Sequence, residues 1–326
     1  MAQHTPAPAS LFKADPQSFL VTGGTGFIGQ RLTAALLAAG HAVTILSRQP
    51  RPSAAAQPER LEFVTDLAQL PRDGAIDVVI NLAGARILGL PWTPGRRKTL
   101  LASRVGVTER VVRWIAGAAH KPRLLISASA IGYYGVQAPG DDRWLTEESP
   151  SQPVFMSQLC QAWEQAAAGA AAHGVTVACL RFGVVLGEGG ALPMLLLPVR
   201  LGLGGRLGAG TQWMSWVHID DLLAAMEHVL GRSALPPVSA WNVTAPEAVR
   251  QIDFSRTAAA LLHRPAFMPT PAWPLRLAMG EQSDLLLQGQ RVQPTRLLAE
   301  GFRFQHPGLS EALAQLCAGP AAAAEH

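Results

Sequence analysis

A glycine pattern near the N-terminus is the first feature that points to chemistry. Gly23, Gly26 and Gly29 follow the apolar segment 19–22 and begin a stretch in which apolar residues recur at helical spacing. Glycines let a chain turn tightly against a diphosphate, and the free N–H groups at a helix start bind its charge. The pattern predicts a dinucleotide-binding turn rather than a tight turn without a ligand. The other residues of this turn expected at the cofactor are Thr25, Phe27 and Ile28.

The residues after the second expected strand indicate which dinucleotide binds. In folds of this kind an Asp or Glu at that position accepts hydrogen bonds from the ribose 2′-OH of NAD. Here the position holds Ser47 and Arg48. A hydroxyl and a guanidinium are donors that suit a phosphate. We therefore expect the 2′-phosphate of NADP at this position; the alternative is a solvated surface arginine.

A serine and two tyrosines in the middle of the chain are the candidates for acid–base chemistry. Ser129 follows the fifth expected strand, and Tyr133 and Tyr134, the two tyrosines of the chain, come shortly after it. We expect Ser129 to lie at the carboxyl edge of the sheet, where ligands bind, and Tyr133, in preference to Tyr134, to donate a proton with help from Arg104 or Lys98. The alternative is that the tyrosines only pack the loop.

Alternating strands and helices must position these residues. Short apolar segments bounded by Gly, Pro or Asp alternate with longer segments of helical spacing. Strands connected through helices form a parallel sheet covered on both faces. We predict an α/β fold with a doubly wound parallel sheet, the Rossmann arrangement, and a smaller C-terminal substrate domain. The expected strands are 19–22, 41–46, 61–64, 76–82, 123–128 and 175–180, with helices that include 97–119 and 158–172 and a return strand at 216–221.

Changes of composition along the chain predict the domain boundaries. The N-terminal segment is rich in Pro and Ala, and the glycine-rich texture after Arg181 is incompatible with regular helix or strand. The predicted parts are a disordered lead-in (1–18), an NADP-binding domain (19–185, joined by 216–245), a smaller substrate domain (186–215 and 246–316) and a tail (317–326).

Composition and charge exclude several classes of function. The net charge is only +4 and no long basic run is present, which argues against a nucleic-acid partner. No apolar stretch approaches the roughly 18 residues of a membrane span. The three cysteines lack metal-binding spacing and fit a reducing compartment. We expect a cytoplasmic protein without a metal site, and a homodimer is compatible with the sequence.

Several ordered motifs resemble a known family. The segment TGGTGFIG, Asn81 to Gly84, the segment SAIGYYG that begins at Ser129, and Val217 to Asp221 resemble extended or atypical short-chain dehydrogenases/reductases. Further blocks resemble the "epimerase family protein" group, described as nucleoside-diphosphate-sugar epimerases, over residues 19–316. These blocks include Trp92, Lys98, Ser103 with Arg104, Trp163 with Glu164, Gly280 with Glu281, and Gly289 to Val292.

The resemblance implies a Rossmann domain with bound NADP(H) and a small C-terminal domain of no established function. It places Leu82, Ala83 and Gly84 near the nicotinamide ribose and Asp66 near the adenine, and Arg104 is a further expected cofactor contact. Members of the wider family use a Tyr with a Lys four residues later as acid and base, and a Ser that orients the substrate oxygen. The resemblance implies this last role for Ser129. The corresponding segment here, 155–160, reads Phe-Met-Ser-Gln-Leu-Cys and contains neither residue.

Two functions remain open at this stage. One is an NADP(H)-dependent oxidoreductase or epimerase acting on a small molecule with a carbonyl or hydroxyl group, which the resemblance extends to sugar nucleotides. The other is a non-catalytic NADP(H)-binding redox sensor or regulator, which the missing Tyr/Lys pair favours. We expect the glycine-rich segment 202–210 with Gln212, Trp213 and Trp216 to act as a lid over the substrate, and Lys98 and Arg104 to meet a substrate phosphate.

Other polar residues are expected to take no direct part in the chemistry. The acidic residues Asp141, Asp142, Glu147 and Glu148 read as solvated surface charges, and His218 as a hydrogen-bonded core or hinge residue rather than a base.

Overall fold

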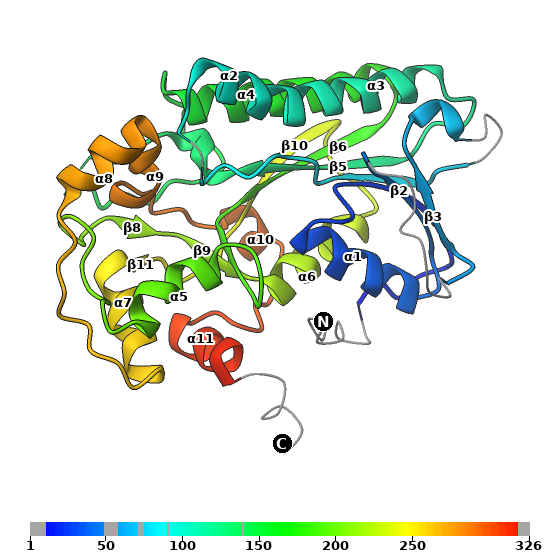
Figure 1. Cartoon of the computed structure of the whole chain (residues 1–326). Helices are drawn as coiled ribbons and strands as arrows, with labels where there is room; N and C mark the ends of the chain where they lie inside the picture. Colours follow the sequence, from blue (N-terminus) through cyan, green and yellow to red (C-terminus); the bar gives the residue numbers. More distant parts are fainter. Residues whose placement is uncertain (1–10, 49–57, 71–74, 90, 139, 319–326) are drawn as a thin grey trace.

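A parallel sheet of seven strands forms the centre of the described part of the molecule (Figure 1). The computed structural model describes residues 11–48, 58–70, 75–89, 91–138 and 140–318. The strand order is β10-β6-β5-β4-β1-β2-β3, and every neighbouring pair is parallel. The order reverses between β1 and β4, the place where such sheets bind ligands at the carboxyl ends of the strands. The strands are β1 (Ser18–Thr22), β2 (Ala42–Leu46), β3 (Leu61–Val64), β4 (Val78–Asn81), β5 (Leu124–Ala130), β6 (Thr176–Phe182) and β10 (Val238–Val243).

Helices cover both faces of this sheet, as the alternating pattern predicts. One face carries α1 and α6, and the other carries α2, α3 and α4 (Figure 1). The expected helix 97–119 starts earlier, at a Thr93 cap followed by Pro94, and a π-helical turn, Ala102–Gly106, separates its halves. The helices are α1 (Phe27–Ala38), α2 (Pro94–Leu101), α3 (Val107–Gly117), α4 (Phe155–Ala168) and α6 (Ile219–Leu230).

The edge strand of the main sheet comes from a different segment than the one expected. The return strand expected at 216–221 is a short strand, β9 (Trp216–His218), which pairs with β7 (Val184–Leu186) outside the main sheet. The seventh strand of the main sheet is β10, which follows the break at Pro236 and Pro237.

A second core lies beside the sheet, built from the segments expected to form the smaller domain. Its buried residues include Leu196, Phe254 and Leu313, which lie on three helices that are far apart in the sequence. The elements of these segments, which do not all enter the second core, are α5 (Leu192–Arg200), α7 (Gln251–Leu261), α8 (Ala272–Met279), α9 (Asp284–Leu287), α10 (Thr295–Ala299), α11 (Leu309–Ala318), β8 (Trp213–Met214) and β11 (Val249–Arg250). Among the described residues no helix combines the length and apolarity needed to cross a bilayer.

The described part of the expected lead-in packs on the fold. Phe12 is buried against the main core, its N–H donates to Glu227, and its carbonyl contacts His41 Nε2 at 2.7 Å. Residues 1–10, and 319–326 of the expected tail, lie outside the described residues.

Candidate functional site

The glycine turn between β1 and α1 has the geometry of a phosphate-binding turn. Gly23 adopts a φ of 70°, and its carbonyl accepts a hydrogen bond of 2.9 Å from the Gly26 N–H. A Cβ atom on Gly29 would lie 2.2 Å from the Gly23 oxygen, so only glycine lets α1 start this close to the turn. No side chain caps the start of α1. Its first N–H groups are therefore available to an anion.

The other residues of this turn divide between solvent and core. Thr25 is exposed, and its carbonyl accepts from Gln30 Nε2 at 2.9 Å. Ile28 packs against the main core. The ring of Phe27 lies directly against the glycine-rich loop 187–190, where a Cβ atom on Gly189 would come within 2.7 Å of the ring. Phe27 thus fixes this loop next to the turn.

The residues expected at the adenosine end follow β2 and β3. Ser47 continues β2, with its N–H bonded to the Val64 carbonyl at 2.9 Å, and Arg48 beside it is exposed. Asp66 is also exposed and caps a short 3-10 helix by accepting from the Ala68 N–H at 2.9 Å. Arg48 is therefore exposed just beyond the carboxyl end of β2.

A polar row crosses the sheet beneath the expected nicotinamide ribose. Thr22, Asn81 and Ser127 are register partners on β1, β4 and β5. Thr22 Oγ1 donates to Asn81 Oδ1 at 2.6 Å and accepts from the Ala83 N–H at 3.2 Å. The row holds the segment Leu82 to Gly84 at the carboxyl edge of the sheet.

Arg104 lies against this segment and is incompletely bonded. Its guanidinium packs on Gly84, and Nη2 donates to the Ala85 carbonyl at 3.1 Å. The residue is only 7% exposed, and Nη1 has no hydrogen-bond partner among the described residues. Burial lowers the pKa of Arg104 to about 10. Its guanidinium also lies over the Trp163 ring. Burying a cation with an N–H that lacks a hydrogen-bond partner costs free energy, and a hydrogen-bond acceptor on a ligand would offset that cost.

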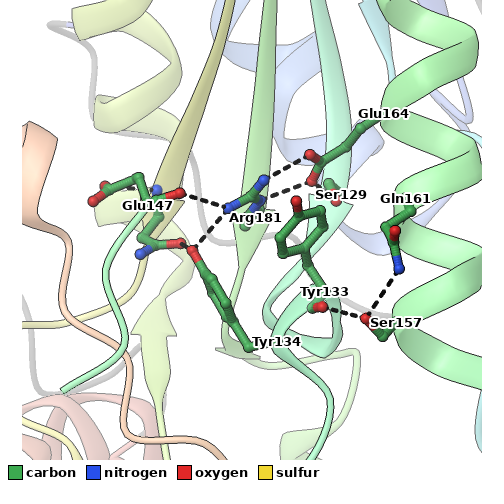
Figure 2. Close-up of polar contacts among 9 residues, drawn as sticks. Ser129, Tyr133, Tyr134, Glu147, Ser157, Gln161, Glu164 and Arg181 are labelled. Atoms are coloured by element: carbon green, nitrogen blue, oxygen red, sulfur yellow. Dashed lines mark hydrogen bonds and ion pairs between the residues drawn. The ribbon is translucent and has the colours of Figure 1, made fainter. Parts of the chain in front are cut away.

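A second polar row involves Ser129. Its register partner on β6 is Arg181, whose partner on β10 is Asn242. Ser129 lies within β5 rather than after it, and its hydroxyl donates to Glu164 Oε1 at 2.6 Å (Figure 2). Arg181 binds both oxygens of Glu164 at 2.8 Å. The Ser129 hydroxyl is therefore committed to a buried ion pair, which differs from the expected contact with a substrate oxygen.

Arg181 is the centre of this network. Burial opposes its charge, but the hydrogen bonds and the charge of Glu164 outweigh burial and raise the pKa of Arg181. Its Nη1 donates to the Tyr134 hydroxyl at 2.9 Å and to the Glu147 carbonyl at 3.2 Å (Figure 2). Its guanidinium also lies 3.5 Å from the centre of the Tyr133 ring.

The two tyrosines have different surroundings. Tyr134 is 1% exposed, and its hydroxyl donates to Asn242 Oδ1 at 2.7 Å. Burial raises the pKa of Tyr134 to about 12, against the effect of Arg181, so this phenol stays protonated near neutral pH. Tyr133 is partly exposed, and its hydroxyl makes no hydrogen bond with the described residues. The geometry favours Tyr133 over Tyr134 as a group that could reach a ligand.

Three of the four acidic residues expected to be solvated are bonded, whereas Glu148 is exposed as expected. Glu147 Oε1 accepts from the backbone N–H groups of Asn242 and Arg296, at 3.0 and 3.2 Å. Asp142 accepts from Arg250 Nη2 at 2.5 Å, and this contact lowers the pKa of Asp142. Asp141 likewise accepts from Arg143. Glu147 therefore joins the two parts of the chain rather than facing water.

A cavity of about 240 Å³ opens at the carboxyl ends of β5 and β6. Its walls come from the loop after β4, from the ends of these two strands, and from the segment 281–290. The tyrosines do not line it, but Gly132 and Gly135 on either side of them do. Met156, from the segment that holds the Tyr/Lys pair in the wider family, also lines it. The cavity lies at the carboxyl ends of parallel strands, the edge at which open α/β sheets bind ligands.

The expected lid residues lie outside this cavity. Trp216 is fully buried in the second core, and Trp213 is stacked between Arg250 and Arg291. Gln212 donates to the Leu286 carbonyl at 2.8 Å. The expectation that these residues contact the substrate is not supported, because packing between the two parts of the chain takes up their side chains. Lys98 is exposed and does not line the cavity either.

Sequence reasoning missed Arg181 and the segment 281–290. Arg181 could have been found as the charged residue within the apolar segment Ala178 to Phe182, because a charge in a buried strand requires a partner. Glu164 stands in a block that carries the family resemblance, but the sequence does not indicate its pairing with Arg181. The segment 281–290 carries no such signal, since its place over the sheet depends on tertiary contacts.

His218 has a structural role, as expected. It caps α6 by accepting from the Asp220 N–H at 3.2 Å and stacks on His306 with ring centres 3.9 Å apart. Burial, reinforced by His306, lowers the pKa of His218 to about 4. His218, His306 and Asp220 also bring ligand atoms within 4.8 Å of one another, but Asp220 is bound by Arg31 at 2.7 Å.

Comparisons with known proteins agree with the fold. The model of the NAD dependent epimerase/dehydratase family matches residues 19–244, and that of a domain of unknown function (DUF1731) matches 270–316. The epimerase family protein YfhF of Bacillus subtilis (strain 168) is 39% identical over 303 residues, 91% of this chain and 97% of that protein. The epimerase family protein SDR39U1 of Mus musculus is 38% identical over 304 residues, 92% of this chain and 99% of that protein.

Solved structures give the same result. The crystal structure of human epimerase family protein SDR39U1 (isoform2) with NADPH has a TM-score of 0.82 and 35% identity, covering 93% of this chain and 100% of that one. A UDP-glucuronic acid 4-epimerase from Bacillus cereus shares only the fold, with a TM-score of 0.72 and 18% identity. With its parallel sheet, glycine turn and C-terminal segment over the strand ends, the chain belongs to the NAD dependent epimerase/dehydratase family, as an epimerase family protein with a C-terminal DUF1731 domain.

Proposed function

We propose that the protein is an NADP(H)-dependent oxidoreductase or epimerase that acts on a carbonyl or hydroxyl group of a small molecule bound in the cavity. The observation that carries this proposal is the position of the cavity. It opens at the carboxyl ends of β5 and β6, on the same sheet edge as the glycine turn and the segment Leu82 to Gly84. A dinucleotide along that edge would bring its nicotinamide end toward the cavity.

The residues present fit such a dinucleotide. The turn at Gly23 and Gly29 leaves room and free N–H groups for the diphosphate, and Arg48 is exposed for a 2′-phosphate. The spare Nη1 of Arg104 is a donor for an acceptor on the nicotinamide riboside. NADP(H), when bound, supplies or accepts a hydride at its nicotinamide ring. The relative crystallised with NADPH supports the same choice.

Tyr133, which lies next to the cavity-lining Gly132 and not in the wall itself, is the proton donor that we propose. Its hydroxyl makes no hydrogen bond with the described residues, and the Arg181 guanidinium 3.5 Å from its ring centre would stabilise the phenolate. Ser129 acts through Glu164, by fixing the carboxylate that holds Arg181 in place.

A non-catalytic NADP(H)-binding protein is the second candidate. It is favoured by the composition of the cavity wall, which contains no Ser, Thr, Tyr or Lys among the described residues. A binding protein needs the cofactor site but no acid or base, so the two candidates differ only in whether hydride transfer occurs.

The cofactor preference is tested with Arg48→Ala, and Arg113→Ala on the exposed side of α3 serves as the control. Loss of a charge-assisted contact to the 2′-phosphate should weaken NADPH binding about 10- to 100-fold and change NADH binding little. Isothermal titration of both cofactors measures the ratio. An unchanged NADPH/NADH ratio in Arg48→Ala would remove the NADP assignment.

Hydride transfer is tested by following NADPH oxidation with carbonyl compounds and NADP⁺ reduction with alcohols. Tyr133→Phe should lower the rate of any reaction found and leave NADPH affinity unchanged. NADPH binding with no transfer to any compound of the panel would favour the non-catalytic candidate.

A further inference from the structure

The wall of the cavity is mostly apolar. Ile87, Trp92, Val154, Met156 and Leu285 contribute to it, from three segments of the chain. Gln290, one of its two amide side chains, is already engaged, because its Nε2 donates to the Gly135 carbonyl. A ligand in this cavity would therefore gain affinity mainly by burying apolar surface.

The charged groups of the wall are all acidic. Glu281 and Asp284 line the cavity, and no Lys or Arg does so among the described residues. Arg97 pairs with Glu281, so that carboxylate is neutralised. The Asp284 carboxylate makes no hydrogen bond or ion pair with the described residues. The electrostatic character of the wall is therefore negative, with one carboxylate left for a ligand.

The cavity is also small. Sites for drug-sized ligands usually have volumes of about 300–1,000 Å³, whereas this one has about 240 Å³. Its wall includes Ala130 and Phe182, at the strand ends that the nicotinamide end of a dinucleotide would approach. The volume of the cavity itself matches a small ring with a short substituent.

We propose that this cavity takes a small, largely apolar carbonyl or hydroxyl compound, neutral or carrying an ammonium group that pairs with Asp284, and does not take a nucleoside diphosphate sugar. The proposal rests on the proposed function for the place of the cavity and narrows its substrate class. A diphosphate needs cationic or N–H donors, and an acidic, apolar wall repels it. An ammonium group gains from Asp284, and an apolar ring gains from the rest of the wall.

Direct binding tests this proposal without requiring turnover. We would titrate four probes into the free protein and into the protein saturated with NADP⁺: 2-phenylethanol, 2-phenylethylamine, 3-phenylpropanoate and UDP-glucose. Leu285→Trp fills the cavity, and Leu277→Trp, which changes a side chain that is 82% exposed, is its matched control. Asp284→Asn removes the carboxylate, and Asp253→Asn on the exposed face of α7 is its control.

The expected order of affinity is amine, then alcohol, then carboxylate, with no binding of UDP-glucose. Leu285→Trp should weaken both the amine and the alcohol about tenfold or more, and Leu277→Trp should change neither. Asp284→Asn should weaken the amine about fivefold without affecting the alcohol.

Three results would overturn the proposal: UDP-glucose binding that Leu285→Trp abolishes, a preference for 3-phenylpropanoate over the amine, or no binding of the alcohol and amine below about 1 mM. The proposed function fails separately. Probes that bind in the cavity while phenylacetaldehyde and related carbonyls never oxidise NADPH would leave this proposal standing and remove the redox activity. Redox turnover of a sugar nucleotide would support the proposed function and overturn the substrate class proposed here.

Discussion

Tyr134 and Tyr133 are neighbours whose environments assign them different roles. The Tyr134 hydroxyl bridges Arg181 and Asn242 in the interior, whereas Tyr133 presents its ring to the same guanidinium and leaves its hydroxyl unbound by the described residues. Adjacent positions on a 3-10 turn point in different directions, so one side chain enters the core while the other remains partly exposed.

This difference predicts opposite outcomes for two matched substitutions. Tyr134→Phe leaves the Arg181 and Asn242 groups without their partner and should lower the free energy of unfolding by about 1–3 kcal/mol. Tyr133→Phe removes no hydrogen bond among the described residues and should change it by less than about 0.5 kcal/mol. Urea denaturation of both variants measures this. Equal losses would mean that Tyr133 also has a buried partner.

The residue scale also shows the limit of sequence reasoning. Ser129 and the tyrosines could be identified as a polar group after a strand, but the partner that engages Ser129 comes from α4. Parallel strands β5 and β6 bring Ser129 and Arg181 side by side, and that register cannot be derived from either segment alone. A sequence therefore indicates which polar residues meet at a sheet edge more readily than which of them remain free.

At the scale of elements, the junction of β1 and α1 depends on a close backbone approach. Gly29→Ala places a methyl group against the Gly23 carbonyl and should cost about 1–3 kcal/mol by forcing α1 away from the turn. The same shift should weaken NADPH binding at least about tenfold.

Gly117→Ala at the end of α3 is the control, because a Cβ atom there meets nothing within 4 Å. It should keep stability and NADPH affinity near the wild-type values. Thermal unfolding with and without NADPH measures both effects, and a Gly29→Ala variant that retains NADPH affinity would contradict the assignment of this turn.

The start of α6 predicts a pH dependence of stability. His218 has a pKa of about 4 in the folded protein and about 6.5 when unfolded. Between these values the unfolded state binds more protons, so stability falls as the pH decreases from about 6.5 to about 4. The groups that face His218 are His306, Asp220 and Arg31, and only the last is a permanent cation.

His218→Asn removes the titrating ring and keeps a residue that caps helices well. The slope of the free energy of unfolding against pH should decrease in this variant by up to about 1.4 kcal/mol per pH unit within that interval. The comparison uses slopes because the variant changes the absolute stability as well. An identical slope in both proteins would show that His218 is not the group that titrates.

Most elements of the sheet were predictable because each strand is a short apolar segment bounded by turn residues. The strand from Leu61 to Val64 has the predicted limits, and the others differ by a few residues at their ends. The exception was β10, where Ser239 and Asn242 interrupt the apolar pattern. Their side chains are buried and hydrogen-bonded to neighbouring elements, which is a tertiary effect.

At the scale of the whole molecule, the C-terminal segment 270–316 is part of the cores rather than an appendage. Leu297 joins the main core, Leu309 and Leu313 join the second, and Val292 packs with Tyr134. A chain that ends at residue 269 should therefore lose cooperative unfolding, since these contacts hold the two parts together. Near-UV circular dichroism during urea titration measures this, and a sharp transition like that of the full chain would identify the segment as dispensable.

The hydrogen bond of 2.6 Å from Gln282 Nε2 to the Ile87 carbonyl closes a loop of 195 residues. Loops of that length are costly to close and form late during folding, whereas the glycine turn, closed by a bond over three residues, forms early. During refolding the protein should therefore recover NADPH binding before it recovers binding of an apolar compound in the cavity. The same order holds on the ribosome, where the glycine turn is synthesised long before the segment that completes the cavity.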